Sequence, residues 1–146
     1  MKTRIRPTAV DLYFIPVTTR VPLKFGHETL TSVTCLRVRL GVEADNGRTA
    51  GGWGETPLSV QWVWPSKLSY QIRERALCDL SRLIADAWAG LDASGHPLEV
   101  GYAFQTEVLP GLLERFNRAS SAGEPMPWLA ALVCCSAYDI AFHDAY

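Results

Sequence analysis

The sequence predicts an α+β fold, in which a three-stranded antiparallel meander is followed by about three helices packed on one face of the sheet. In the first half of the chain, apolar residues alternate with polar residues, which is the period of a half-buried strand. In the second half, apolar residues recur three and four positions apart, which is the period of an amphipathic helix. The 146 residues suit a single domain, because domains commonly hold roughly 100–150 residues.

The strands are predicted from this alternation and from one turn. Residues 10–14 form the first strand and residues 36–43 the second. The segment 45–47, Asp-Asn-Gly, tolerates the positive φ of a tight hairpin turn, so residues 49–55 are expected to return as the third strand. We expect Trp53 to point into the core, and we expect the three glycines of this strand to mark a bulge or close backbone packing.

Two long connections are predicted as loops, residues 18–31 and residues 56–66. Long loops in compact domains often bind ligands. The first carries a mixed polar and aromatic tip of Lys24, Phe25 and His27, which could touch a ligand or could simply be solvated. The second carries Trp62 and Trp64 between prolines, where tryptophan more often caps a core or an interface than faces water.

Three helical stretches follow. Residues 69–90 carry an apolar stripe from Ile72 to Ala87, with Gly90 as the stop. Residues 98–117 form a second stretch, in which Pro110 either kinks the helix or opens its second half. The third, residues 127–146, is apolar on most faces and has no stop signal, so we expect it to be buried on several sides and the chain to continue beyond it.

Charge and composition argue against several classes of protein. The 14 basic and 15 acidic residues leave a net charge of −1, which gives no field to attract nucleic acid or an anionic membrane. No apolar run approaches the roughly 20 residues that span a bilayer, and no signal-peptide pattern follows the start, so a cytoplasmic protein is expected. The four cysteines form no CxxC pair, and we expect buried thiols.

No complete catalytic site is visible. Glu55 is a lone carboxylate without a partner for acid–base work. Asp139 and His143 share a helix face, but a metal needs at least a third ligand, and an intrahelical hydrogen bond explains the pair. A metal site built from the three histidines, His27, His96 and His143, is the least favoured interpretation.

In their order along the chain, these features resemble the amino-terminal capping domain of the enolase superfamily, in its mandelate racemase and muconate lactonizing enzyme branch. The resemblance is carried by Arg20, Pro22-Leu23, the valine-rich strand over 33–42 and the Gly52-Trp53-Gly54-Glu55 motif. The last segment, 137–145, is similar to the A-x-D-x-A helix that leads into the barrel of that family. Each motif is short, and their shared order over almost the whole chain makes the resemblance specific.

The resemblance implies a capping domain over residues 1–126 and, over 127–146, a helix leading toward a barrel domain that this chain lacks. That barrel would hold Mg²⁺ and the base that removes the proton α to a small carboxylate substrate, in a racemase, cycloisomerase or dehydratase. This chain would hold no metal or cofactor, would be inactive alone, and could form a homo-oligomer. Its two loops would contact the substrate and exclude water, through Lys24, Phe25, His27, Thr56, Trp62 and Trp64. The alternative is a freestanding ligand-binding or assembly module with the same fold.

Overall fold

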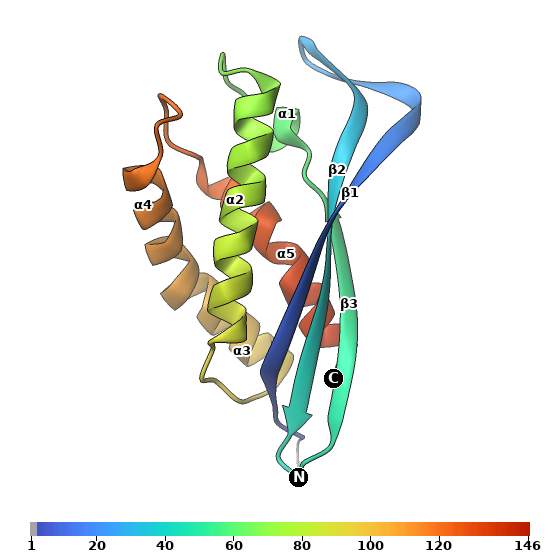
Figure 1. The fold of residues 1–146 in the computed structure, drawn as a ribbon, viewed down its shortest axis with the longest axis vertical. Coiled ribbons are helices and arrows are strands. Elements are labelled where there is room, and N and C mark those ends of the chain that lie inside the picture. Colours follow the sequence, from blue (N-terminus) through green and yellow to red (C-terminus); the bar gives the residue numbers. More distant parts are fainter. Residues whose placement is uncertain (1–2) are drawn as a thin grey trace.

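The fold has two layers, a sheet and a set of helices that cover one of its faces (Figure 1). A computed structural model describes residues 3–146, and for Phe25 it describes the backbone alone. The strands β1 (Ile5–Phe25), β2 (Glu28–Ala44) and β3 (Thr49–Pro57) pair antiparallel in the order β1-β2-β3, which confirms the predicted meander and the α+β class. The helical elements are α1 (Val60–Val63), α2 (Tyr70–Ala89), α3 (Pro97–Ala103), the π-helical turn η1 (Phe104–Val108), α4 (Leu109–Ala119) and α5 (Trp128–Asp144).

The alternation of β2 places its apolar residues against the helices. Leu36, Val38 and Leu40 are fully buried, while Arg37 and Arg39 between them reach the outer face of the sheet. Gly47 has a φ of 77° in the tight turn that the sequence predicted. Beyond this turn, β3 pairs with β2 without a register shift, so the bulge that was one alternative for its glycines does not form.

The prediction that Trp53 points inward is wrong. Trp53 pairs with Arg39 on the outer face, is 47% exposed, and lies 6.1 Å from the ring of Tyr13. The inner positions of β3 belong to Gly52 and Gly54, where an added Cβ would overlap the backbone of α5. Helix α5 thus lies too close to β3 for any side chain, which is the close backbone packing that the glycines were expected to mark.

Residues 18–31, which we call the arm, are not a loop as predicted but the outer end of the β1–β2 hairpin. Leu23 pairs with Leu30, and Gly26 forms the turn with a φ of 58°. The register shifts between Thr18 and Leu23, because the residues between them outnumber those on the partner strand. This irregularity breaks the alternation on which the strand prediction depended.

Helix α2 begins and ends as predicted, and Ala76, Leu80 and Ile84 of the predicted stripe are buried, but other stripe residues are not. The Ser69 hydroxyl accepts a hydrogen bond from the Ile72 amide at the start, and the helix stops at Gly90. Ile72 and Leu83 of the predicted stripe are 45% and 41% exposed, whereas Arg73, placed on a polar face, is only 2% exposed. Arg73 donates two hydrogen bonds inside the fold, and a pattern of hydrophobicity cannot anticipate them.

The second helical stretch continues through Pro110 with a local change of pitch. Pro110 lies in the first turn of α4, where its missing N–H is tolerated, and the π-helical turn η1 precedes it. Pro110 therefore opens the second half of this helical stretch, which is one of the two predicted alternatives.

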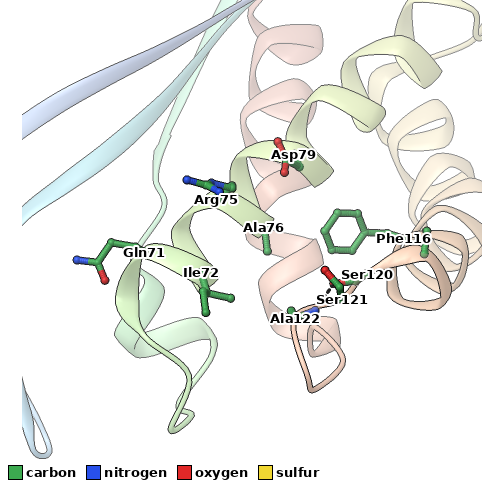
Figure 2. A pocket seen from close by; sticks show the side chains of 10 residues that line it. Gln71, Ile72, Arg75, Ala76, Asp79, Phe116, Ser120, Ser121 and Ala122 are labelled. Atoms are coloured by element: carbon green, nitrogen blue, oxygen red, sulfur yellow. Dashed lines mark hydrogen bonds between the residues drawn. The ribbon is translucent and has the colours of Figure 1, made fainter.

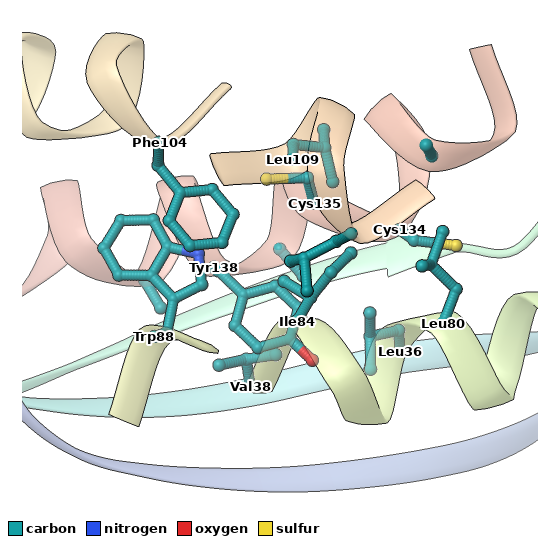
Figure 3. Close-up of a cluster of buried hydrophobic side chains, with 14 of the residues drawn as sticks. Leu36, Val38, Leu80, Ile84, Trp88, Phe104, Leu109, Cys134, Cys135 and Tyr138 are labelled. Atoms are coloured by element: carbon teal, nitrogen blue, oxygen red, sulfur yellow. The ribbon is translucent and has the colours of Figure 1, made fainter. Parts of the chain in front are cut away.

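Helix α5 packs against β3 and β2 and also against α2, and it supplies much of the core (Figure 3). Tyr138 is fully buried and donates a hydrogen bond of 2.6 Å to the Ser81 carbonyl of α2. Cys134 and Cys135 are buried free thiols, as expected, and burial raises the pKa of each to about 12. The helix ends at Asp144, whose carboxylate accepts a hydrogen bond of 2.8 Å from the Trp53 amide of β3. Among the described residues, none of the helices combines the length and apolar character needed to cross a bilayer.

Candidate functional site

The two segments predicted to contact a ligand meet at one end of the sheet. The arm lies at the same end of the molecule as α1 and the start of α2 (Figure 1). Between them runs a groove of about 340 Å³. Its walls carry hydroxyl, amide and carboxylate groups, from Glu28, Thr29, Thr31, Ser32, Gln61, Tyr70 and Gln71. The groove therefore offers hydrogen-bonding groups from both segments.

A buried guanidinium joins the two sides of this groove. Arg73 of α2 donates through Nη2 to the Glu28 carboxylate of the arm at 2.7 Å. Through Nη1 it donates to the Trp64 carbonyl, directly after α1, at 2.6 Å. Both bonds are charge-assisted and short, so they tie the arm and the segment around α1 to the same helix.

The residue after Arg73 in α2, Glu74, binds strand β2 three residues beyond the arm. The Thr34 hydroxyl donates to the Glu74 carboxylate at 2.7 Å. Partial burial, with the nearby negative charge of Glu74, raises the pKa of Tyr70 to about 12. The Tyr70 hydroxyl therefore stays protonated at neutral pH and remains a hydrogen-bond donor in the wall of the groove.

The six predicted contact residues are distributed around this end and do not form one cluster. Lys24 and His27 are exposed at the tip of the arm, and the side chain of Phe25 lies outside the described part of the chain. Trp62 is 54% exposed on α1, and Thr56 is half-buried at the end of β3.

Trp64 differs from the other predicted contact residues. It is 3% exposed, and its indole N–H donates to Glu124 at 3.0 Å. Its ring thus packs in the core. The sequence allowed either a core position or a contact role for Trp64, and the structure shows the core position.

Arg73, which joins the two segments, was not found from the sequence. Arg73 and Tyr70 lie outside both predicted loops, and Gln61 lies within the second loop but was not singled out. One signal was present: Arg73 lies three and four residues before the buried Ala76 and Leu77, a spacing that puts all three on one helix face.

A second, larger groove of about 500 Å³ lies between α2 and the end of α4 (Figure 2). Ile72 and Phe116 line it together with Arg75 and Asp79. None of the predicted contact residues lies there, and we assign it no function.

The other candidates for chemistry have structural partners. Glu55 forms an ion pair with Arg37 at 2.6 Å on the outer face of the sheet. His143 contacts the Asp139 carbonyl at 2.9 Å within α5. Over residues 3–146, no three side chains of metal-ligating type come together. The described residues thus offer no donor set for a divalent cation.

Comparison with known proteins gave matches at the level of three-dimensional structure alone. No family model matches the chain, and no curated protein matches its sequence. Solved structures of mandelate racemase/muconate lactonizing enzyme type and of named epimerases and dehydratases are similar to it over most of its length.

Three of these structures illustrate the extent of the similarity. A dipeptide epimerase from Cytophaga hutchinsonii is 18% identical over 94% of this chain and 28% of its own, with a TM-score of 0.47. An L-talarate dehydratase from Polaromonas sp. JS666 is 15% identical over 94% of this chain and 31% of its own, with a TM-score of 0.48. The L-Ala-D/L-Glu epimerase from Bacillus subtilis is 22% identical over 83% of this chain and 29% of its own, with a TM-score of 0.42. This chain thus spans less than a third of the length of each.

Proposed function

We propose that this chain is the N-terminal capping domain of an enolase-superfamily enzyme, and that its arm and α1 segment form part of the wall of a substrate site. The substrate would be a small carboxylate, and the chemistry would occur on a barrel outside this chain. The division into a cap over residues 1–126 and a connecting helix over 127–146 is part of this proposal.

One observation carries the proposal. The two segments that the family resemblance assigns to substrate contact lie side by side, and they share a groove lined with hydrogen-bonding groups. Exposed side chains at the arm tip and on α1 extend this surface. Such segments can close over a ligand and exclude water from it.

Mg²⁺ would have to be held by residues outside this chain. Carboxylates that converge on one point are the ligands that this cation prefers, and the described residues contain no such group. When bound in a barrel, the cation would stabilise the enolate formed by removal of an α-proton. The part assigned to this chain is to bind and orient the substrate and to exclude water.

Proton exchange tests the proposal directly. The purified 146-residue chain, with its mass confirmed, would be incubated in D₂O with dipeptides and sugar acids, with and without Mg²⁺. We expect no exchange of the α-proton by NMR, and we expect the coding frame to continue past Tyr146 into barrel strands with spaced Asp and Glu residues. Exchange catalysed by the chain alone would overturn the proposal.

The alternative is a freestanding ligand-binding or assembly module. One observation favours it: most apolar side chains of α5 are buried within this chain, although Trp128, Leu129 and Ile140 are exposed. A stop codon directly after Tyr146, with a soluble product that unfolds cooperatively, would support this module and contradict the capping domain.

A further inference from the structure

Arg73 is the least expected charge in the molecule. It lies near the start of helix α2, is 2% exposed, and makes its two polar contacts to segments outside that helix. A buried charge is costly unless it is paired and hydrogen-bonded, and a hydrophobic residue of similar volume is often as stable or more stable. Its Nε atom is buried without a partner, which adds to that cost. Stability alone therefore explains this residue poorly.

The planar guanidinium suits a different task. It presents donors in a fixed fork, so two acceptors bound to it are held at a fixed separation. Here the two acceptors are the Glu28 carboxylate on the arm and the Trp64 carbonyl after α1. Glu28 lines the groove from the arm and Gln61 lines it from α1, so the separation of these two points bears on the width of the groove.

The arm needs such a tie because little else holds it. Strand β3 ends where Pro57 pairs with Cys35, so beyond that point the sheet has two strands only. Isolated two-stranded hairpins are marginally stable in water. Leu30 is the buried one among the arm residues whose side chains are described, and the register shift after Thr18 provides a place where the arm can bend.

We propose that Arg73 is a positioning residue, which sets the spacing between the arm and the α1 segment from helix α2 without touching the ligand. That a ligand binds in this groove rests on the proposed function. The spacing set by Arg73 does not depend on it, so the spacing experiment and the proton-exchange experiment can succeed or fail separately.

Distance measurement between two spin labels tests this spacing. The labels are placed on cysteines introduced by His27→Cys at the arm tip and Trp62→Cys on α1, both exposed, in a chain where Cys78→Ser removes the half-buried thiol. We expect a narrow distance distribution with Arg73 present. With Arg73→Met, we expect a distribution that is broader and shifted to longer distance, since both ties are lost.

Amide exchange provides a second readout of the same motion. In Arg73→Met, loss of the charge-assisted hydrogen bond to Glu28 should speed hydrogen exchange of the arm amides by about tenfold. Exchange of the amides of residues 36–42, in the three-stranded part of the sheet, should stay unchanged. Arg73→Lys should restore only part of the narrow distribution, because one ammonium group cannot span both acceptors in the same geometry.

Two matched variants make the outcome decisive. Arg75→Met removes an exposed arginine from the same helix and should change neither readout. Glu28→Ala removes the tie from the arm side at a residue whose side chain is 37% exposed, so it serves if Arg73→Met does not fold. A distribution for both Arg73→Met and Glu28→Ala as narrow as with Arg73 present would overturn the proposal, as would equal broadening with Arg75→Met.

Discussion

The two ends of the sheet are built in opposite ways. At the end near the β2–β3 turn, three paired strands lie under α5, with Gly52 and Gly54 pressed against its backbone. At the other end, two strands form the arm, whose residues from Val21 to Lys24 are exposed. Backbone contact fixes the first end, and a few side-chain ties hold the second. One small sheet thus combines a tightly packed base with an exposed outer end.

The largest expected effect comes from adding one methyl group at the rigid end. In Gly54→Ala, the new Cβ would overlap the Ala137 carbonyl, and helix backbone cannot yield as a side chain can. We expect a loss of about 3 kcal/mol in the free energy of unfolding, measured by urea denaturation. Gly51→Ala is the control, because its Cβ meets only the flexible end of Arg39 on the outer face. Equal losses in the two variants would show that β3 and α5 are not in close contact.

The dependence of the unfolding free energy on alkaline pH should test whether water reaches the buried thiols of the helical layer. Burial raises the pKa of Cys134 to about 12 from an ordinary value near 9, so the unfolded chain releases this proton at lower pH than the folded chain. The contribution of this thiol to the unfolding free energy should be constant at pH values well below 9. It should fall as pH rises from 9 to 12, by about 3 kcal/mol at pH 11.

The matched variant is Cys134→Ala, which should reduce the slope of unfolding free energy against pH over this range. Burial also raises the pKa of Cys135 to about 12 and that of Cys78 to about 11, so part of the slope should remain. A slope that does not change in Cys134→Ala would mean that water reaches this thiol in the folded chain.

The start of α2 should show an intermediate effect. Ser69→Ala removes the hydroxyl that caps the helix holding Arg73, and we expect a loss of about 1 kcal/mol. Ser59 occupies the same position before α1 but makes no such side-chain bond, so Ser59→Ala should be close to neutral. Thermal melting of the two variants measures the difference, and a larger effect of Ser59→Ala would contradict this assignment.

The smallest effect is expected at the arm tip. Lys24→Ala and His27→Ala remove exposed side chains and should each change the unfolding free energy by less than about 0.5 kcal/mol. Leu30→Ala, in contrast, removes the buried side chain of the arm and should cost about 2 kcal/mol. A strong destabilisation by either tip variant would mean that the tip is part of the packed structure and not a free binding surface.

Local signals were sufficient for much of the fold. The alternation along β2, the Asp-Asn-Gly turn, and the limits of α2 at Ser69 and Gly90 all depend on residues within one or two turns of each other. The same holds for the apolar character of α5, which predicted its burial on several sides. These features could therefore be predicted without knowledge of any distant contact.

The candidate site was predictable only in part. The sequence located both segments, through their length and their exposed aromatic and charged residues. It did not reveal that residues 18–31 are paired strands, because a register shift hides the alternation there. The groove and its tie at Arg73 depend on a helix that begins about forty residues after the arm. No pattern among neighbouring residues can predict that contact.

The sequence by itself thus determined the order of three strands and three helical stretches, the β2–β3 turn and the limits of α2, and which stretches are rich in possible contact residues. Only the tertiary structure decided which way Trp53 faces and why Arg73 is buried. The physical reason is the same for both. Periodicity reports how a segment divides its own faces, whereas α5 against Gly52 and Gly54, and Glu28 against Arg73, are contacts between segments far apart in the chain.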